Sequence, residues 1–435
     1  GADVTFGKTR GTGVEGEYHV VYAYDEEQVG LTVADLATEM VHQMIPESLR
    51  GDATIRDDFD FEEEIEELIT YAQRRQFGPS TASLVRAAQE RDIPWIRLND
   101  YSLVQFGHGK YQRRIQATVT SETRHIAVEI ASDKEETNQL LGDLGLPVPR
   151  QVLTRNVRRA VRAAERIGYP VVVKPYNANH GRGVSLNLMT AEQVEKAVEK
   201  AKEHSRTILV EKMIEGFDHR MLVIDGELVA VAKRVPGHVV GDGTHSIAEL
   251  VDIVNQDPRR GVGHEKVLTR LELDYQAERL MQKAGYSADT VLPENEVFYL
   301  RATGNLSTGG TAIDMTDHVH HDNRDMAMRA ARAIGLDVAG VDFITPDITR
   351  SYREVGGAIC EVNAAPGFRM HVAPTEGTPR DVAGPVMDML FPPNSPSRIP
   401  IVAITGTNGK TTTSRMVAHI LKMSGSTVGL TTTDG

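Results

Sequence analysis

Apolar and polar residues repeat with two different periods along the 435 residues of this chain. Residues 18–24 (YHVVYAY) alternate at every second position, as in a β-strand, whereas residues 33–45 repeat apolar positions every three or four, as on one face of a helix. A capped helix is predicted over residues 80–94, ending before the proline, with a short strand after it. The first 132 residues are therefore predicted to form a mixed α/β domain.

The pattern changes at residue 133, from which strands and helices are predicted to alternate up to residue 390. Residues 391–400 (FPPNSPSRIP) contain four prolines and two serines, which predicts a linker. An apolar strand then runs into a glycine turn, a lysine and threonines at 401–413 (IVAITGTNGKTTT). Residues 401–435 are thus expected to begin a second nucleotide-binding domain, whose parallel sheet lies outside this chain.

Charge and composition exclude several classes of function. The formal net charge is -13, which argues against nonspecific binding to nucleic acid or to an anionic membrane. We find no signal peptide, but a first residue of glycine leaves open a removed N-terminal segment. The single cysteine excludes an internal disulfide framework and fits a reducing compartment. We expect a cytoplasmic protein with no nucleic-acid or membrane partner.

Three charged or histidine-rich clusters have an ordinary interpretation and a functional one. The acidic run at 57–68 is typical of a solvated helix face, although it could bind a cation. Lys110, Arg113 and Arg114 fit an exposed strand edge, or a site for an acidic substrate. Three histidines at 317–322 suggest zinc, but their spacing matches none of the usual structural sites, so the start of a helix is favoured.

A lysine and a glycine loop suggest phosphate binding. Residues 169–175 (YPVVVKP) form a β-branched strand that places Lys174 near its end, where an ammonium group can hold a phosphate. Gly181 and Gly183 flank Arg182 shortly afterwards, and glycines let backbone N–H groups fold around an anion.

The next segment adds groups suited to a nucleoside and a carboxylate. A strand ends in Glu211 and Lys212, and a hairpin follows with its turn at 225–226. Asp218 can accept two hydroxyl hydrogen bonds from a ribose, and Arg220 can bind a carboxylate or phosphate in a forked way.

Three oxygen-bearing residues predict a site for a hard cation. Glu361 and Asn363 lie two apart on one predicted strand and so share a face, whereas Cys360 and Val362 are expected to point into the core. Asp342 is flanked by apolar residues on another strand, and its carboxylate is expected to leave the apolar face. Mg²⁺ is the natural ion for this set of ligands, although polar alternation on a solvated sheet would give the same pattern.

A polar loop follows Arg301, which itself follows an apolar strand. Arginine, hydroxyl groups and backbone amides suit a carboxylate that becomes an acyl phosphate. The loop residues predicted to bind substrate are Asn305, Ser307, Thr308 and Gly309.

Residues 133–390 resemble the ATP-grasp superfamily. The residues that carry the resemblance follow the order of that family: Lys174, the glycine loop, Glu211, Lys212, Asp218, Asp342, Glu361 and Asn363. The resemblance implies an α/β (α+β) fold in which two α/β subdomains clasp ATP and Mg²⁺. It also implies that Lys174 contacts phosphates, Asp218 holds ribose, and Glu211, with the backbone at Lys212 and Ile214, faces adenine. A carboxylate would be phosphorylated by ATP, and an amine would then displace the phosphate.

Two ATP-grasp groups share the string at 241–261 (GDGTHSIAELVDIVNQDPRRG): the glutathione-synthetase module of fused enzymes and the cyanophycin synthetases. The motif GTNGKT resembles the ATP loop of Mur-type ligases, with Ile404 where a strict Walker A motif has its first glycine. The residues it assigns to ATP are Gly406, Thr407, Asn408, Gly409, Lys410 and Thr411. An ATP-grasp domain followed by a Mur-like start resembles the cyanophycin synthetase family.

That resemblance implies a homo-oligomer that extends a cyanophycin primer with L-aspartate and L-arginine. The ATP-grasp domain would add aspartate at the C-terminal carboxylate, and the Mur-like domain would add arginine to the β-carboxylate by an isopeptide bond. Arg220 and Arg301 would grip carboxylates and stabilise the tetrahedral intermediate. A glutathione-type ligase is the alternative, although it predicts a glutamate–cysteine ligase domain before residue 133. The N-terminal domain could instead serve as a scaffold that binds the polymer.

Overall fold

The computed structural model is described here for most of the chain. The described residues are 6–24, 26–49, 56, 58–176, 183–261 and 266–433. They divide into two compact units, one of residues 1–78 with 99–101 and one of residues 79–98 with 102–435. The domain limits predicted from the sequence remain a prediction.

The first unit contains a hairpin and two helices. Strands β1 (Gly7–Gly11) and β2 (Tyr18–Tyr22) pair antiparallel, and α1 (Glu27–Met44) and α2 (Phe61–Arg75) follow, with a short helix η1 (Glu47–Leu49) between them. Glu26 caps α1 and pairs with Arg75 of α2 at 2.8 Å. The predicted strand and helix are confirmed, and the described part of the acidic run lies mostly on the largely exposed α2.

The second unit begins with a helix and a small antiparallel sheet. Helix α3 (Pro79–Glu90) confirms the prediction and packs against α13 (Ala383–Leu390). The sheet has the order β3 (Trp95–Arg97), β4 (Leu103–Phe106), β5 (Arg113–Gln116) and β6 (Val119–Thr120), with η2 (Gly109–Tyr111) between β4 and β5. In the basic cluster, Arg113 pairs with Glu122 at 3.3 Å.

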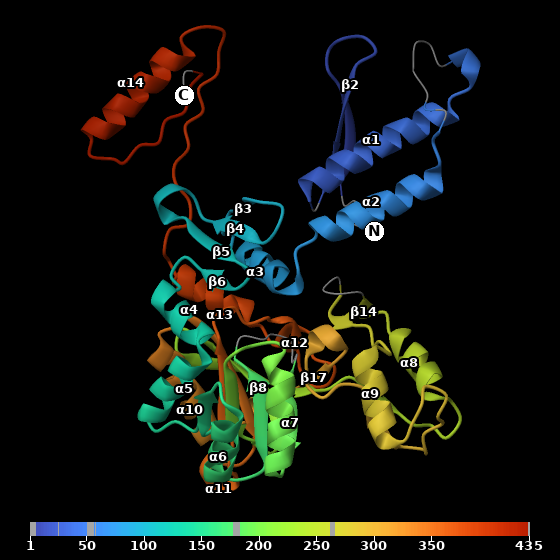
Figure 1. Ribbon diagram of the computed structural model, residues 1–435. Helices are drawn as coiled ribbons and strands as arrows, with labels where there is room; N and C mark the ends of the chain where they lie inside the picture. The colour runs from blue at the N-terminus through green and yellow to red at the C-terminus, as the bar shows by residue number, and fades with distance from the viewer. Residues whose placement is uncertain are drawn as a thin grey trace. The chain divides into compact units, whose positions relative to one another are not determined.

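A four-stranded antiparallel sheet carries part of the site. Its order is β7 (Gln151–Thr154), β10 (Ile208–Lys212), β8 (Val171–Pro175) and β9 (Ser185–Leu188). Helices α6 (Val157–Ile167) and α7 (Ala191–Lys202) pack their alanine- and valine-rich faces against it (Figure 1). Because side chains alternate along a strand, the opposite face of this sheet remains for polar groups.

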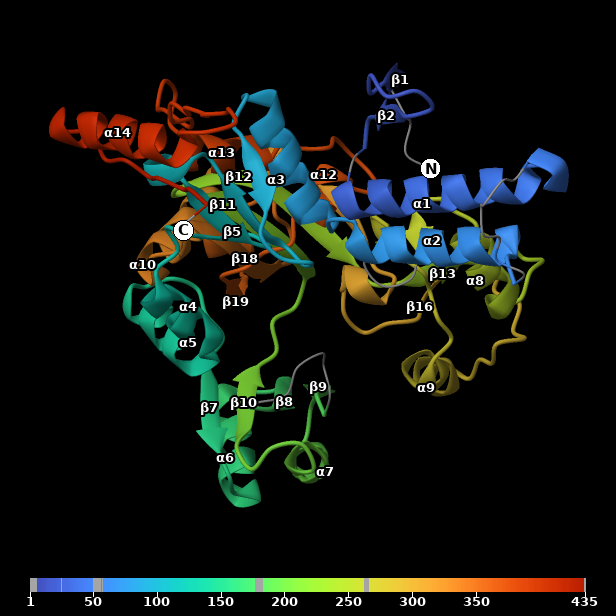
Figure 2. The same ribbon diagram turned by 90° about the horizontal axis from the view of Figure 1, so that it is seen from above.

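A five-stranded antiparallel sheet carries the rest of the site (Figure 2). Its order is β17 (Thr311–Asp314), β12 (Glu227–Val235), β11 (Phe217–Ile224), β18 (Val338–Thr345) and β19 (Ala358–Asn363). One face forms the largest hydrophobic core with α4 (His125–Ser132), α5 (Lys134–Asp143) and α10 (His321–Ile334). Residues such as Met221 and Phe343 are completely buried in that core, so the polar residues that alternate with them on the same strands face the other way.

The remaining elements complete the second unit. Helices α8 (Ile247–Asn255) and α9 (Tyr275–Ala284) share a hydrophobic core with the paired strands β13 (His238–Val240) and β16 (Val297–Tyr299). The short elements are β14 (Arg260–Gly261), β15 (Leu268–Thr269), η3 (Leu306–Thr308), η4 (Thr316–His318), α11 (Tyr352–Val355) and α12 (Arg369–Val372).

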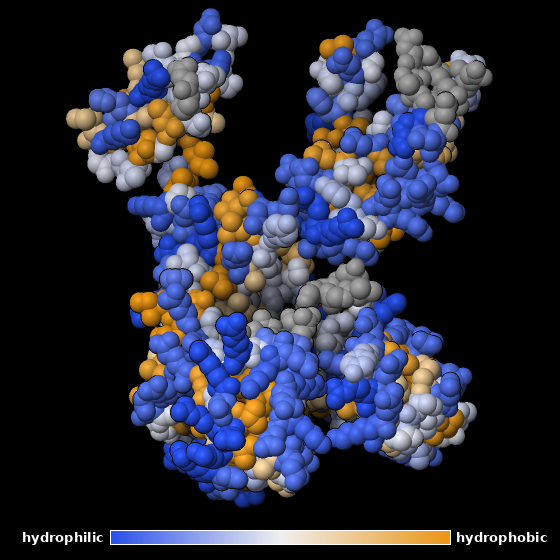
Figure 3. Space-filling view, viewed as in Figure 1, coloured by the Kyte–Doolittle hydropathy of each residue, from blue (hydrophilic) through white to orange (hydrophobic). Residues whose placement is uncertain are grey.

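The C-terminal segment differs from the prediction in one respect. Helix α14 (Lys410–Met423) forms, but residues 401–405 are irregular instead of a strand, and Ile401 and Val402 are 74% and 64% exposed. Figure 3 shows apolar side chains of this segment at its surface. The prediction was wrong because a parallel strand forms only beside a partner, and none of the described strands pairs with these residues.

Among the described residues, no helix combines the length and the apolar character that a membrane span requires.

Candidate active site

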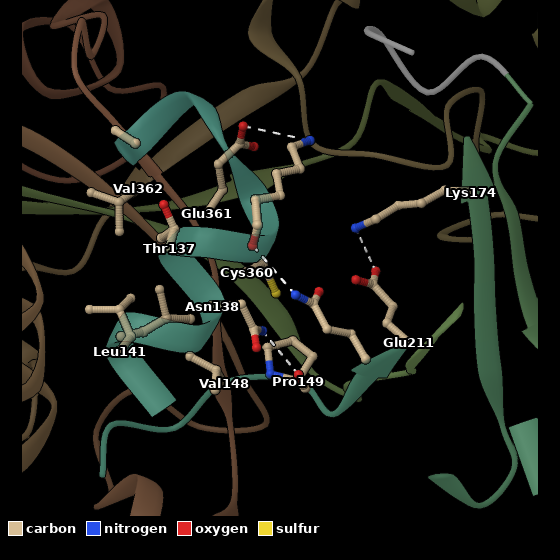
Figure 4. A pocket seen from close by; sticks show the side chains of 14 residues that line it. Thr137, Asn138, Leu141, Val148, Pro149, Lys174, Glu211, Cys360, Glu361 and Val362 are labelled. Atoms are coloured by element: carbon tan, nitrogen blue, oxygen red, sulfur yellow. Dashed lines mark hydrogen bonds and ion pairs between the residues drawn. The ribbon is translucent and has the colours of Figure 1, made fainter. Parts of the chain in front are cut away.

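A pocket lies between the four-stranded sheet and the edge strand β19 of the larger sheet. Lys174 and Glu211 line it from one side and Cys360 and Glu361 from the other (Figure 4). The structure thus brings together residues from four separate segments of the sequence, which are 131–151, Lys174, Glu211 and 359–362.

Lys174 and Glu211 occupy neighbouring strands of the four-stranded sheet. Lys174 is paired in register with Leu209, two residues before Glu211, so both polar side chains lie on the face away from α6 and α7. The Lys174 ammonium group donates to Glu211 Oε1 at 2.7 Å, and both side chains are largely buried. A lysine in this position can contact phosphate, and the neighbouring carboxylate can accept an amino hydrogen.

The Lys212 side chain is held by backbone groups outside the pocket. Its Nζ atom donates to the carbonyl oxygens of Gly168 and Tyr169, at 3.0 and 2.8 Å, and so ties β10 to the end of α6. Ile214 follows in irregular backbone. Gly181 and Arg182 of the glycine loop lie outside the described residues. Gly183 has a left-handed φ of 70°, a conformation that favours glycine.

Lys134 is a site residue that the sequence analysis missed. It lines the pocket at the first position of α5, and its Nζ lies 3.7 Å from Glu361 Oε1. Asp133 caps this helix. Hydrogen bonds from the Glu136 N–H and the Tyr176 hydroxyl lower the pKa of the Asp133 carboxyl group. In sequence Lys134 looks like a surface lysine; the signal that could have revealed it is the capping aspartate just before it.

The prediction that Cys360 points into the core was wrong. Its side chain is exposed and lines the pocket, next to Glu361. The cause is a β-bulge, because Asp342 pairs with Glu361 but Phe343 pairs with Ile359, which leaves Cys360 as an extra residue on β19. Desolvation in the cleft raises the pKa of the thiol, and the Glu211 carboxylate adds to this effect.

Four charged residues form a network on the polar face of the larger sheet. Arg220 lies opposite Asp342 in register and donates to it through Nε, and Arg234 lies opposite Asp218. Arg234 Nη2 contacts Asp218 Oδ1 at 2.7 Å and Asp342 Oδ2 at 3.0 Å. Two guanidinium groups therefore share two carboxylates.

Electrostatics within this network favour a charged Asp342. Burial opposes its ionisation, but Arg220 and Arg234 outweigh that effect and hold the pKa of Asp342 below its usual range. Burial also raises the pKa of Asp218, against the pull of Arg234. The paired arginine network thus keeps a negative charge at the centre of the sheet.

The predicted metal ligands lie together and suit Mg²⁺. Asp342 and Glu361 are opposite each other on β18 and β19, and Asn363 lies two residues further along the same strand. Asn363 donates its amide hydrogen to the Gly340 carbonyl at 3.2 Å, which leaves its Oδ1 atom for a cation. These oxygen donors fit a hard cation, with Asp342 also held by the two arginines.

Arg301 is buried in a different part of the unit. It contacts Asp274 at 3.1 Å and donates to the carbonyl oxygens of Leu300 and Glu272, while its Nε has no partner within the described ranges. No hydrogen bond or ion pair between described residues joins it to Asp342. The structure therefore does not bring the two predicted arginines, Arg220 and Arg301, into one network.

The polar loop predicted to bind substrate is held by its own hydrogen bonds. Asn305 Oδ1 accepts from the Ser307 N–H at 2.9 Å, and the Thr308 hydroxyl donates to the Asn305 carbonyl at 3.1 Å. Gly309 ends this short helix with φ of 90°, where a β-carbon would lie 2.5 Å from Leu271.

The motif predicted to bind a second nucleotide forms a glycine turn before α14. Gly409 is the N-cap residue with φ of 77°, and Gly406 has φ of 147°. Lys410 Nζ donates to the carbonyl oxygens of Gly406 and Thr407, at 2.8 and 3.4 Å, and the Thr411 hydroxyl lies 3.4 Å from that of Thr433. Asn408 lies within the same turn.

The histidine cluster marks the start of a helix, as favoured from the sequence. His320 is the N-cap residue of α10, and its Nδ1 accepts from the Asp322 N–H at 3.1 Å. Possible ligand atoms of His320, His321 and Asp322 lie within 4.8 Å of one another. However, an Nδ1 that accepts this bond places the proton of a neutral ring on Nε2, which leaves no free lone pair for a metal.

Three family profiles match the sequence. A cyanophycin synthase-like N-terminal domain matches residues 1–46, an ATP-grasp domain matches residues 129–236, and a RimK-like ATP-grasp domain matches residues 301–387. The two ATP-grasp matches cover the two sheets that border the pocket. The predicted α/β fold with an ATP-grasp domain is therefore confirmed.

Similar proteins extend this result. The cyanophycin synthetases of Crocosphaera subtropica and Trichormus variabilis are 49% and 48% identical over 99% and 100% of the chain, which spans 49% and 48% of their lengths. A glutathione biosynthesis bifunctional protein of Mannheimia succiniciproducens is 34% identical over 68% of the chain and 40% of its own length. The crystal structure of a bifunctional glutathione synthetase from Pasteurella multocida aligns with a TM-score of 0.60 and 29% identity, covering 76% of this chain and 47% of that one. The chain thus spans about half the length of the cyanophycin synthetases that it resembles throughout.

Proposed function

We propose that this chain, which contains an ATP-grasp domain and is similar throughout to about half of the cyanophycin synthetases, belongs to an ATP-dependent amide ligase that extends cyanophycin. The observation that carries the proposal is the pocket in which two lysines face two glutamates, beside the opposed pair of Asp342 and Glu361. Such a site collects the cations and oxygen ligands that a nucleoside triphosphate and Mg²⁺ require.

The proposed reaction has two steps at this site. The C-terminal carboxylate of the polymer attacks the γ-phosphorus of ATP, which releases ADP and forms an acyl phosphate. The amine of L-aspartate then attacks the acyl carbon, and phosphate leaves as the amide bond forms. Mg²⁺, held by Asp342, Glu361 and Asn363, would neutralise charge on the phosphates.

The chain's own residues have separate roles in this proposal. Lys134 and Lys174 would bind phosphate oxygens, Glu211 and the backbone after it would face adenine, and Asp218 would bind ribose. Arg220, placed directly opposite Asp342, would grip the reacting carboxylate and stabilise the anionic intermediate. Arg301, which precedes the polar loop in the sequence, would also grip a substrate carboxylate.

A second activity is proposed for the C-terminal segment and the rest of its domain. The GTNGKT turn and α14 have the form of a phosphate-binding loop, in which Lys410 would reach the β- and γ-phosphates and Thr411 would hold Mg²⁺. That domain would add L-arginine to the aspartate β-carboxylate. We further propose that the whole protein is a cytoplasmic homo-oligomer.

A polymerisation assay tests the proposal. The full-length protein is incubated with ATP, Mg²⁺, a short cyanophycin primer and aspartate, with or without arginine, and phosphate release is measured. Lack of primer-dependent release with aspartate would reject the main proposal. Lys410→Ala should block arginine addition but allow a single aspartate addition, and equal loss of both steps would argue against separate sites.

The same assay distinguishes the proposed function from a second candidate, a glutathione-type ligase. The 34% identity to a glutathione biosynthesis protein supports that candidate. A glutathione-type ligase would release phosphate with γ-glutamylcysteine and glycine, without any primer. Activity with those substrates and none with primer and aspartate would favour this alternative.

A further inference from the structure

Arg369 is a buried cation that has no ion pair with a carboxylate of the described residues. Its residue is 8% exposed, yet its one hydrogen bond with the described part of the chain goes to the Lys266 carbonyl at a long 3.4 Å. No ion pair with a described carboxylate holds its guanidinium group, whereas Arg220, Arg234 and Arg380 are all paired with aspartates. Desolvation, with nothing opposing it, lowers the pKa of Arg369.

Such an arrangement is costly in a folded protein. A buried charge normally has a partner of opposite sign, because removal from water is unfavourable unless Coulomb attraction and hydrogen bonds offset it. Guanidinium offers five donors in a planar fork, and four of them remain here for a ligand. The group that would complete this arrangement is an anion with two oxygens in one plane.

The position of Arg369 indicates which substrate supplies that anion. Helix α12 packs on β12 and β17, and Met370 contacts Ala232 and Ala312 on those strands. Ala232 lies opposite Arg220 in register, so α12 covers the same sheet face as the Asp342 network. Arg369 therefore belongs to the polar face of the sheet and not to the hydrophobic core behind it.

The order of the sheet separates this position from the nucleotide pocket. The pocket is lined by β19 at one edge, whereas α12 covers β12 and β17 at the other, with β11 and β18 between them. The metal ligand Asp342 and its partner Arg220 lie on those two central strands. A molecule that reacts with the terminal phosphate would approach from the side of Arg369.

A neighbouring arginine adds positive charge on this side. Arg260 is also buried, and its Nη1 donates to the carbonyl oxygens of Thr269 and Gly309. Gly309 belongs to the polar loop already predicted to bind substrate. Arg260 and Arg369 both donate to carbonyl oxygens of the segment 266–269, so two buried guanidinium groups contact one segment.

We propose that Arg369 binds a carboxylate of the amino-acid or polymer substrate. This site would lie on the polar face of the sheet, at the β12–β17 edge, whereas the nucleotide pocket lies at the β19 edge. This inference rests on the proposed function, because it assigns a carboxylate-bearing acceptor to that side. The carboxylate belongs either to the primer end or to the incoming aspartate, and the experiment distinguishes the two.

Kinetics of the full-length protein test the proposal. KM values for ATP, primer and aspartate are measured for the wild type, Arg369→Lys and Arg369→Met. The matched control is Arg350→Gln, an exposed arginine paired with Glu354. Loss of a charged, forked contact should raise one KM by about 10-fold or more. A rise for aspartate identifies the incoming amino acid, and a rise for primer identifies the polymer end. Unchanged values for both, or a rise for ATP alone, would overturn the proposal.

Thermal melting separates binding from a structural role. Because no carboxylate among the described residues pairs with Arg369, Arg369→Met should be at least as stable as the wild type. ADP with Mg²⁺ should raise the melting temperature of both proteins, whereas primer or aspartate should stabilise only the wild type. Failure of both Arg369 variants to fold would instead assign the guanidinium a structural role and refute the inference.

One probe keeps the inference testable if the proposed function fails. If the wild type shows no primer- and aspartate-dependent phosphate release, succinate is used as a simple dicarboxylate in the melting assay. Stabilisation of the wild type but not of Arg369→Met would still support a carboxylate site. Equal effects on the two proteins would reject it.

Discussion

Replacing Asp342 by asparagine should destabilise the protein strongly, apart from any effect on catalysis. The carboxylate is 7% exposed and is shared by Arg220 and Arg234. Asparagine keeps the size of the side chain but removes its charge. Asp218 would then be the one carboxylate left within this network of four charged residues to balance two largely buried guanidinium groups.

The expected magnitude follows from the burial of this network. Removing one partner of a buried ion pair costs about 3–5 kcal/mol, because the remaining charge stays desolvated. That is a large part of a total stability of about 5–15 kcal/mol, and for a unit of this size it should lower the melting temperature by roughly 4–7 °C. Asp388→Asn is the matched control, since Asp388 pairs with Arg91 at 2.8 Å but is 53% exposed. Its loss should cost about 0–1 kcal/mol.

Urea unfolding at pH 7, followed by circular dichroism and fluorescence, measures both variants. Adding Arg220→Met to Asp342→Asn should recover part of the lost stability, because it removes one unbalanced buried cation. Equal unfolding free energies for Asp342→Asn and Asp388→Asn would refute the reasoning, since the network would then be no more desolvated than a surface pair.

Three further predictions concern the pocket and the buried histidines. Lys134→Ala should weaken ATP binding by about 10-fold, measured by calorimetry, whereas removing the exposed Lys422 should not. Cys360, the single cysteine, should react slowly with a disulfide reagent because its pKa is raised. ATP should slow the reaction further if it binds in the pocket that Cys360 lines. An unchanged rate with ATP would show that Cys360 does not line the ATP site. Burial lowers the pKa of His219 to about 4 and that of His371 to about 3. Between about pH 6.5 and 4 only the unfolded chain binds these protons. The free energy of unfolding should therefore decrease as the pH is lowered from 6.5 to 5, by roughly 2 kcal/mol per histidine. His371→Gln should reduce that slope in urea unfolding, and an unchanged slope would contradict the assignment.

Local patterns in the sequence were sufficient to place many side chains on the correct face. Two-residue alternation placed Asp342 opposite the core that contains Val341 and Phe343, and it placed Val362 in that core. Such predictions succeed because the face of a side chain follows from strand geometry alone.

The same pattern failed where a strand's geometry depends on its neighbour. Cys360 was assigned to the core because strict alternation requires it, but the bulge against β18 turns it into the pocket. The strand predicted at 401–405 did not form, because a strand also needs a partner for its backbone hydrogen bonds.

What the sequence alone supplied is therefore a prediction of the kind of chemistry, because the lysine proposed to bind phosphate, the oxygen ligands proposed for Mg²⁺ and the glycine turns are local in sequence. Only the tertiary structure decided which of these residues meet. It brought Lys134 to Glu361 and Arg220 to Asp342, and it left Arg369 buried without a carboxylate partner in the described part of the chain. The physical reason is that contacts between distant segments depend on how sheets pair and which helices cover them, and no local period in the sequence records that pairing.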